Sequence, residues 1–365
     1  MTERELKPGT MIADRYEITG AIGEGGMQEV YSADDTTFAR IVAVKVPKNL
    51  SAEKRFKRSA ILSARVNHPN VAKTLDYIPG PPKDYLVEEF VAGEDLRDLA
   101  DRYHRMDPFL VGHILHHLAK AIAASHHVGV IHRDLKPSNI MVSTEPWPVQ
   151  IKITDFGIAK MAEDELVEAI ELGVDKSITT SATLVGALPY MSPEFIDDSQ
   201  EADKPADIWS LGAISYELMS GRLPFGSGLA AVPKIVAARL PKKPTVYGSS
   251  QQFGSFVDEL WGLVKLCLKA DPGHRPTADA LVKECEGLCY SVQPREFGTV
   301  KNFGDSAGEY GFIQRSTGLD VFFHRSSYYG AKPKVGEPVV YSAFVSGARP
   351  RAHPVVPLTK AYGST

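Results

Sequence analysis

Two acidic residues, a lysine and an amide, set at close spacing in one part of the chain, constrain its fold more than any other feature. Asp134, Lys136 and Asn139 lie in the short segment 132–139, and Asp155 follows an apolar run that predicts a strand. A carboxylate and an amide brought to one point can hold Mg²⁺ through oxygen. A second carboxylate can accept a hydroxyl proton, and a lysine can stabilise charge that develops on a phosphoryl group. The segment therefore predicts a metal-dependent site that acts on phosphoryl groups.

A glycine-rich hairpin near the N-terminus is followed by a strand that ends in a lysine. Gly23, Gly25 and Gly26 separate two predicted strands, and backbone N–H groups in such a turn can approach phosphates closely. The β-branched run 41–44 then leads into Lys45, whose ammonium group can bind phosphate as a point charge. The hairpin alone is a weak signal, but its place ahead of Lys45 and the acidic segment makes a phosphate-binding role the better interpretation.

These segments follow one another in the order found in eukaryotic-like serine/threonine protein kinases, and the chain resembles that family over about residues 10–290. The resemblance implies an α+β, bilobal protein-kinase fold that uses ATP and Mg²⁺ to phosphorylate a protein substrate at serine or threonine. Apolar residues at helical spacing predict a long helix over 109–128. The resemblance also implies a buried helix that opens at Asp207 and is tied to the catalytic segment, and an ion pair between Glu194 and Arg275.

The same resemblance assigns a role to each residue of the candidate site. Asp134 would be the catalytic base, and Lys136 would stabilise the transferred phosphoryl group. Asn139 and Asp155 would hold Mg²⁺, and Lys45 would pair with the α- and β-phosphates of ATP. The other residues expected around the nucleotide are Ile22, Gly23, Gly25, Gly26, Val30, Ala43, Glu88, Glu89 and Val91.

Four residues depart from the family pattern. Gln28 replaces the third glycine of the hairpin, Ser59 falls where the family has the glutamate that clamps the strand lysine, and Ala187 replaces a threonine. Glu88 falls at a gatekeeper position that is usually apolar. Because a buried unpaired carboxylate is costly, we predict that Glu88 replaces the missing glutamate as the partner of Lys45. The departures leave a second interpretation open: a pseudokinase that binds nucleotide weakly and serves as a scaffold for an RNA-binding module.

A long polar segment lies between the metal-binding triplet and the next family motif. It resembles an activation loop whose hydroxyl residues accept phosphate, although a merely polar loop would have the same composition. We expect Mg²⁺-dependent autophosphorylation within this segment. The candidate phosphorylation sites are Thr179, Thr180, Ser181 and Thr183.

From residue 297 the chain changes to short alternating strands separated by glycines. Alternation places Tyr310 with Phe312 on one face of a strand, and Phe322 with His324 on one face of another. If those strands are neighbours, the four rings form a platform on which unpaired bases can stack. The alternative is that the rings are the core of a small barrel without a ligand.

This tail, residues 297–358, resembles the cold-shock domain, a five-stranded OB-type β-barrel that binds single-stranded RNA or DNA. Asn302 replaces the stacking tryptophan that the family has in the first strand, which predicts weaker binding than is usual for the family. The residues implied in nucleic-acid binding are Lys301, Phe303, Tyr310, Phe312, Phe322 and His324.

Charge is distributed unevenly along the chain, whose net charge is −4. Residues 291–365 carry a net charge of +4, and residues 1–290 carry −8. The linker 291–296 spans at most about 20 Å, so the barrel is expected to stay near the large lobe. Opposite charges then favour a docking contact that a polyanion would disrupt, and we expect oligonucleotide to change the autophosphorylation rate.

Composition adds few limits. A hydrophobic content of 43% and a charged content of 24% are ordinary for a globular protein. No apolar run long enough to cross a membrane and no signal-like N-terminus occur, so we expect a cytoplasmic protein without a membrane partner.

Cys285 and Cys289 are expected to be buried thiols rather than a metal half-site. His113 and His117 are expected to form a solvated helix face rather than a metal pair. The sequence predicts no oligomeric state.

Overall fold

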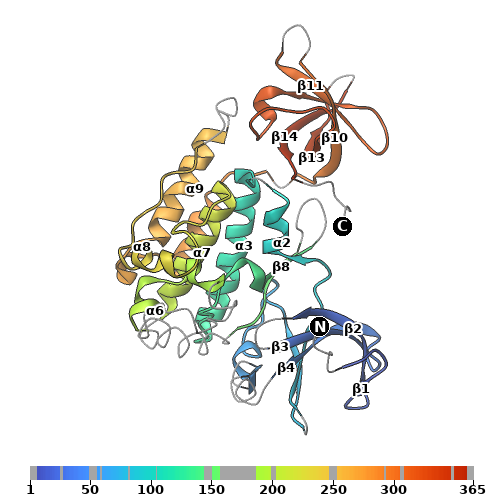
Figure 1. The fold of residues 1–365 in the computed structure, drawn as a ribbon, viewed down its shortest axis with the longest axis vertical. Helices are drawn as coiled ribbons and strands as arrows, with labels where there is room; N and C mark the ends of the chain where they lie inside the picture. Colours follow the sequence, from blue (N-terminus) through green and yellow to red (C-terminus); the bar gives the residue numbers. More distant parts are fainter. Residues whose placement is uncertain are drawn as a thin grey trace.

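The protein consists of a small lobe, a large helical lobe and a C-terminal barrel, as the computed structural model shows (Figure 1). The small lobe and the barrel lie at opposite ends of the large lobe. Among the residues that the structure describes, no helix is long and apolar enough to cross a membrane. The described residues are 6–24, 28–48, 56–57, 60–80, 83–103, 105–143, 150–156, 186–198, 203–245, 253–291, 293–304, 308–346 and 349–359.

The small lobe is built on a six-stranded antiparallel sheet with the strand order β1-β2-β3-β4-β6-β5. The strands are β1 (Met11–Ile12), β2 (Tyr16–Glu24), β3 (Gln28–Asp35), β4 (Arg40–Pro47), β5 (Thr74–Ile78) and β6 (Tyr85–Glu89). Side chains alternate along β2, so that Tyr16 and Ile18 are buried. Residues 56–57 and 60–63 are helical, and Phe56 and Ala60 pack against Leu86 of the sheet.

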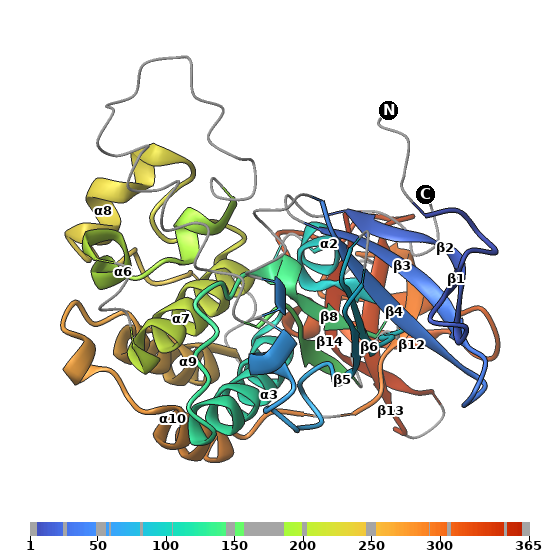
Figure 2. The same ribbon diagram turned by 90° about the horizontal axis from the view of Figure 1, so that it is seen from below.

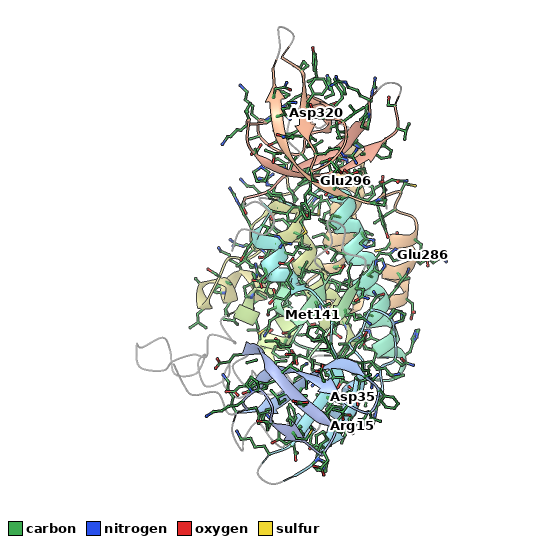
Figure 3. The ribbon with its side chains drawn as sticks, turned by 90° about the vertical axis from the view of Figure 1, so that its right-hand side faces the viewer. Arg15, Asp35, Met141, Glu286, Glu296 and Asp320 are labelled. Atoms are coloured by element: carbon green, nitrogen blue, oxygen red, sulfur yellow. The ribbon has the colours of Figure 1, made fainter. Side chains whose placement is uncertain are left out.

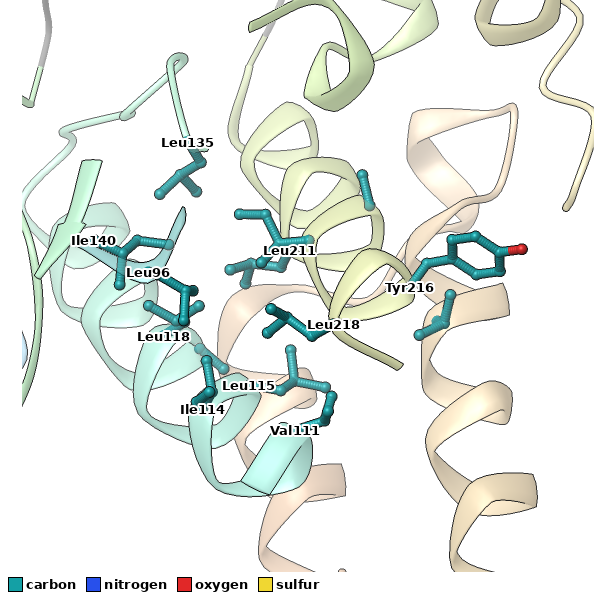
Figure 4. Packing of buried hydrophobic residues seen from close by; sticks show 14 of the residues in the cluster. Leu96, Val111, Ile114, Leu115, Leu118, Leu135, Ile140, Leu211, Tyr216 and Leu218 are labelled. Carbon is teal, nitrogen blue, oxygen red and sulfur yellow. The ribbon is translucent and has the colours of Figure 1, made fainter. Parts of the chain in front are cut away.

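The large lobe is mainly helical, and its core lies where two long helices meet a short strand. Its helices are α2 (Leu96–Asp101), α3 (Pro108–His127), α6 (Pro193–Asp197), α7 (Lys204–Ser220), α8 (Val232–Val236), α9 (Gly254–Cys267) and α10 (Ala278–Glu286). A small sheet contains β7 (Glu94–Asp95), β8 (Ile140–Val142) and β9 (Ile151–Ile153), and single turns occur at Pro137–Asn139, Leu188–Tyr190, Leu229–Ala231 and Pro272–His274. Leu115 and Leu118 of α3 pack near Leu211 and Leu218 of α7 and Ile140 of β8 (Figure 4).

Local sequence sets the geometry of the two central helices. Asp107 caps α3 by accepting a hydrogen bond from the Leu110 N–H, and a proline follows it. Helix α7 ends at Gly221, whose φ of 67° favours glycine. Gly212 lets α9 approach α7 closely, because a Cβ there would lie 2.6 Å from the Cys267 Cβ. Both helices expected from the sequence are therefore confirmed, and α7 is buried on almost every side.

Two expectations about this lobe are wrong. Cys285 is buried in α10, but α10 ends before Cys289, which is exposed, so the two thiols do not form a buried pair. His113 is buried rather than solvated, because α10 and Tyr290 cover that side of α3. The His113 ring centroid lies 4.3 Å from that of His117. Within the described part of the chain, no group of three or more His, Cys, Asp or Glu side chains could hold a metal ion.

The C-terminal region is a closed five-stranded barrel with the strand order β10-β11-β12-β14-β13, in which β13 also pairs with β10. The strands are β10 (Glu296–Phe303), β11 (Tyr310–Gln314), β12 (Val321–His324), β13 (Pro338–Phe344) and β14 (Arg351–Pro357). Val300, Ile313 and Phe323 are buried in its interior. Seen from the small-lobe end of the molecule, β2 to β4 lie in front of the barrel strands (Figure 2).

The barrel docks against the large lobe through aromatic and aliphatic side chains. The Phe253 ring is fully buried, stacks on His353 with a centroid distance of 5.2 Å and meets Tyr329 edge-on at 5.1 Å. The barrel residues that join the core cluster of the large lobe are Tyr329, Val340, Val356 and Leu358. The barrel is therefore continuous with the core of the large lobe rather than loosely tethered to it.

A buried ion pair closes the same interface. Arg295 donates to both carboxylate oxygens of Asp107 at 2.6 and 2.8 Å, and the exposed fractions of the two side chains are 1% and 0%. Glu296, the next residue, begins the barrel (Figure 3). The expected contact between barrel and large lobe is confirmed, but apolar packing and this pair hold it. The linker, expected over 291–296, takes part through Arg295 and ends there, because Glu296 is the first residue of β10. Salt screens a buried ion pair much less than it screens surface charges. We therefore expect a polyanion to disrupt this contact far less than it would disrupt a contact between surface charges.

Candidate active site

The segment 132–139 forms a tight loop between α3 and β8. Lys136 Nζ donates to Asp134 Oδ2 at 2.9 Å, and Asn139 Nδ2 donates to the same oxygen at 3.0 Å. A further hydrogen bond from Asn139 Nδ2 to the Asp134 carbonyl oxygen, at 2.8 Å, closes the loop. Two donors therefore fix the direction of one carboxylate, as a general base requires.

Asp207, in the first turn of α7, anchors this loop. Its carboxylate accepts the N–H groups of His132 and Arg133 at 2.9 and 2.8 Å, and lies 2.9 Å from His126 Nε2. Burial alone would raise the pKa of Asp207, but the bonds from His126 and the His132 N–H hold it below its usual range. Arg133 has a φ of 65°, which is costly for a residue with a side chain. The expected tie between α7 and the loop is confirmed.

Lys45, on β4, lies between two carboxylates. Its Nζ is 2.5 Å from Glu88 Oε2 and 2.8 Å from Asp155 Oδ1. Burial lowers the pKa of Lys45, but the carboxylates of Asp155 and Glu88 outweigh burial and raise it, so the ammonium group stays charged. Burial raises the pKa of Glu88 against the opposing effect of Lys45. The predicted contact between Glu88 and Lys45 is confirmed.

Gln28, which replaces a glycine of the family pattern, contacts the second acid. Its Nε2 donates to Asp155 Oδ1 at 2.7 Å. Burial raises the pKa of Asp155, but Lys45 and the hydrogen bond from Gln28 lower it below its usual value. Asp155 also has a φ of 61°, so its backbone is strained. Two small-lobe side chains thus hold an ionised carboxylate of the large lobe.

Asn139 and Asp155 fit the requirements of an Mg²⁺ site. The Thr154 N–H donates to the Asn139 carbonyl oxygen at 2.9 Å, which joins the two segments. Asn139 turns its Nδ2 toward Asp134, so its amide oxygen faces the other way. Asp155 is anionic because its pKa is lowered. Mg²⁺ usually takes one or two protein oxygens and completes its shell with water and phosphate, and these residues can supply that number.

Strand pairing brings other expected nucleotide-binding residues together. Gly23 lies opposite Val30 in the β2–β3 pair, and Val30 lies opposite Lys45 in the β3–β4 pair. Ala43 lies opposite Glu88 in the β4–β6 pair. The sheet therefore gathers these residues on four neighbouring strands, β2, β3, β4 and β6, around the lysine.

The remaining expected residues differ in their surroundings. Glu89 pairs with Lys152 of β9 at 3.0 Å, Val91 is buried, and Ile22 is half exposed. The expected residues that lie outside the described part of the chain are Gly25, Gly26, Ser59, Thr179, Thr180, Ser181 and Thr183.

The expected ion pair between Glu194 and Arg275 is confirmed. Arg275 donates to both carboxylate oxygens of Glu194 at 2.6 and 2.8 Å. Its guanidinium also lies 5.0 Å from the ring centroid of Trp209 in α7. A bidentate pair of this kind fixes orientation, so it attaches the start of α6 to the helical core.

On the barrel, cross-strand pairing places the expected rings side by side. Tyr310 lies opposite His324, and Phe312 lies opposite Phe322, in the antiparallel pair β11–β12. The ring centroids of Tyr310, Phe312 and Phe322 are 5.6 to 6.4 Å apart. These three side chains are half-buried and His324 is exposed. The expectation that the two strands are neighbours is confirmed.

Two arginines outside the predicted set of binding residues lie over this aromatic face. The guanidinium carbon of Arg349 is 5.2 Å from the Phe312 ring centroid, and that of Arg351 is 5.6 Å from the Phe322 ring centroid. The sequence around them, Arg-Pro-Arg, is a basic signal that could have drawn attention to them. Their contacts with the rings depend on β14 lying beside β12.

Two other residues expected in nucleic-acid binding are engaged within the barrel. Phe303 is half-buried, and its ring stacks on Phe323 of the barrel core at 5.8 Å. It lies opposite Gly311, on the inward side of β11. Lys301 is exposed, and its Nζ pairs with Asp320 Oδ2 at 2.7 Å. These contacts place Phe303 apart from the outward rings.

Comparison with known proteins agrees with the geometry of the loop. The protein kinase domain family matches residues 16–285. The serine/threonine-protein kinase pkn3 of Myxococcus xanthus is 34% identical over 292 residues, which cover 77% of this chain and 51% of that protein. The serine/threonine-protein kinase PknB of Mycobacterium leprae is 33% identical over 294 residues, which cover 78% of this chain and 44% of that protein.

This chain thus matches about half the length of these relatives, or less. Among solved structures, that of Rad53 1–466 in complex with AMP-PNP is similar with a TM-score of 0.56 and 24% identity, covering 74% of this chain and 64% of that chain. That similarity concerns the fold alone. The family match spans most of the chain and includes the loop that carries Asp134. The chain belongs to the protein kinase family, and both of the bacterial relatives named above are serine/threonine kinases.

Proposed function

We propose that the protein transfers the γ-phosphoryl group of ATP to serine or threonine hydroxyls of protein substrates. The observation that carries this proposal is the Asp134 carboxylate, which Lys136 and Asn139 hold in a fixed direction. Lys45 and Asp155, one from each lobe, lie in contact, and the segment that carries Asp155 is bonded to the same loop through the Thr154 N–H and the Asn139 carbonyl oxygen. A proton acceptor, a phosphate-binding cation and metal-binding oxygens therefore belong to one site.

In the proposed reaction the acceptor oxygen forms a bond to the γ-phosphorus while the bond to the β-phosphate oxygen breaks and ADP leaves. Asp134 takes the hydroxyl proton. Lys136 stabilises negative charge on the transferred group, and Lys45 orients the α- and β-phosphates. Mg²⁺ held by Asn139 and Asp155 would neutralise charge on the phosphates when bound.

Asp134→Asn tests this proposal, because the amide keeps the shape of the side chain but cannot act as the base. We expect the transfer rate to fall by about 100- to 10,000-fold. Transfer of labelled phosphate from ATP, followed by mass spectrometry of the protein, measures the rate and locates the acceptor sites. Equal phosphate on wild type and variant would contradict the proposal, and no phosphate on either would favour the pseudokinase scaffold.

We also propose that residues 297–358 form an OB-type, cold-shock-like domain that binds single-stranded RNA or DNA. Three outward rings on neighbouring strands support stacking of unpaired bases. Arg349 and Arg351 beside these rings offer charge for phosphates. Titration of the full-length protein with a labelled single-stranded oligonucleotide at two salt concentrations tests this proposal. Affinity should fall with salt and exceed that for the matching duplex; equal affinity for both would contradict stacking.

Because the barrel is docked, we propose that it brings the kinase to substrates bound to nucleic acid. Release of the barrel from the large lobe by nucleic acid has less support. The docking contact uses Phe253, Arg295 and their partners, whereas the aromatic face uses other residues. Nucleic acid can therefore bind without displacing the barrel. We expect saturating oligonucleotide to leave the transfer rate to a free peptide acceptor unchanged, whereas a changed rate would favour the coupling predicted from charge.

A further inference from the structure

Lys45 is held by a carboxylate that belongs to its own sheet. In the β4–β6 pair, Ala43 lies opposite Glu88 and Lys45 lies opposite Leu86. Residues two apart on a strand share a face, so Lys45 and Glu88 are diagonal neighbours on one face of the sheet. Long side chains reach each other from such positions. The register of backbone hydrogen bonds therefore sets the contact of 2.5 Å between Lys45 Nζ and Glu88 Oε2.

The two carboxylates beside Lys45 differ in their access to solvent. The exposed fraction of the side chain is 6% for Lys45, 4% for Glu88 and 20% for Asp155. A carboxylate buried as deeply as Glu88 is costly without a cation against it, and Lys45 is the cation that lies there. Asp155 is more accessible, also accepts a hydrogen bond from Gln28, and follows the segment that is bonded to Asn139.

We propose that Glu88 is the permanent positioning residue of Lys45, whereas Asp155 is an exchangeable partner that turns from the lysine toward the cation when Mg²⁺ and nucleotide bind. This inference rests on the proposed phosphoryl transfer. Glu88 keeps the ammonium group oriented after Asp155 has turned away. Because both members of the pair lie on hydrogen-bonded strands, the direction of Lys45 does not depend on where the helical residues 56–57 and 60–63 lie.

Glu88→Gln tests the inference, since it keeps the size of the side chain and removes its charge. Asp155 is then the carboxylate left against Lys45, and Mg²⁺ must compete with the lysine for it. We expect the Mg²⁺ concentration for half-maximal binding of a fluorescent ATP analogue to rise about 10-fold. The reason is that Mg²⁺ must then break the hydrogen bond between Asp155 and the charged Lys45. The misplaced lysine should also lower kcat/KM for ATP by about 100-fold.

Asp35→Asn is the matched control. Asp35 is a second fully buried carboxylate of the small-lobe sheet, paired with Arg15 at 2.8 Å and with Arg40 at 3.3 Å. It lies at the far end of β3 from the residue paired with Lys45. We expect this variant to melt at a lower temperature and to keep the wild-type dependence of nucleotide binding on Mg²⁺.

The binding titration, made on the full-length protein, separates the outcomes. Wild-type Mg²⁺ dependence and nucleotide affinity in Glu88→Gln would overturn the inference. An equal shift in Asp35→Asn would overturn it too, because the effect would then come from a loosened sheet. A wild-type protein that binds nucleotide with Mg²⁺ but transfers no phosphate would refute the proposed function, while the titration would still decide the role of Glu88.

Discussion

His116 links the stability of the large lobe to pH. Its Nδ1 lies 2.8 Å from the Tyr290 hydroxyl oxygen, and its side chain is buried. Burial, and next the charge of Lys120, lower the pKa of His116 from 6.5 to about 4. Between these two values the unfolded chain binds a proton that the folded protein does not. Stability is therefore fully present above pH 6.5 and falls as the pH is lowered toward about 4.

His116→Gln should flatten the dependence of the free energy of unfolding on pH in this window. The slope should fall by at most about 1.4 kcal/mol per pH unit, which corresponds to one proton. Some slope remains, because burial lowers the pKa of His117 as well. Urea unfolding at a series of pH values measures the slope. His127→Gln, at an exposed position on the same helix, is the control, and a wild-type slope in His116→Gln would contradict the assignment.

Some contacts within the site can be predicted from the sequence, and others cannot. Asp134 and Asn139 are close in the chain, so a single turn brings them together and their spacing is informative. The partnership of Glu88 with Lys45 could be predicted because a buried carboxylate needs a cation. The bond from Gln28 to Asp155 could not, because it joins residues 127 apart and depends on how far the Gln28 side chain reaches.

Among the elements, paired strands decide how the aromatic face of the barrel is built. A period of two places Tyr310 with Phe312 on one side of β11, and the sequence is enough to predict this. Phe303 was expected among the binding residues but faces the barrel core. The pairing of β10 with β11 is irregular between Val300 and Asn302. After this irregularity the side chains of β10 point to the opposite face of the sheet from the one that strict alternation predicts. The sequence carries no clear sign of this irregularity.

Phe312→Ala and Phe322→Ala should each weaken binding of a single-stranded oligonucleotide. We expect a loss of about 1–3 kcal/mol for each, because each removes one stacking surface. Fluorescence anisotropy with the full-length protein measures the affinity. Val335→Ala changes an apolar side chain that is 69% exposed, between β12 and β13, and should have no effect. If both phenylalanine variants keep wild-type affinity, the rings serve only to pack the barrel.

At the scale of the whole molecule, α3 connects the barrel with the loop 132–139. Near its N-terminus Asp107 pairs with Arg295, and in its last turn His126 lies 2.9 Å from Asp207. The sequence predicted both modules and their proximity. It could not predict the docking surface, because the residues that form it come from several separate segments and each is an ordinary apolar or charged residue.

Phe253→Ala should destabilise the large lobe and the barrel together. The Phe253 ring is fully buried against His353, Tyr329 and Phe109, so its removal should cost about 3–5 kcal/mol. Urea unfolding followed by tryptophan fluorescence, which reports on the large lobe because all three tryptophans lie before residue 291, and by circular dichroism, which also reports on the barrel, measures the loss. Leu319→Ala, at a position 61% exposed, should leave stability unchanged. A loss below about 1 kcal/mol, the centre of the range for ordinary substitutions, would show that the contact contributes little.

Two attachment points restrict how the barrel can move. Its first strand follows Arg295, which is bonded at the start of α3, and its last strand leads to Thr359, whose N–H donates to the Arg102 carbonyl oxygen at 2.8 Å. A body fixed at one point can swing in any direction, whereas a body fixed at two can turn only about the line between them. The rings around Phe253 oppose that rotation as well. A nucleic-acid strand bound to the barrel would then keep a constant distance and direction from Asp134. Protein substrates bound to the same strand would be selected by how far along it they lie from the barrel.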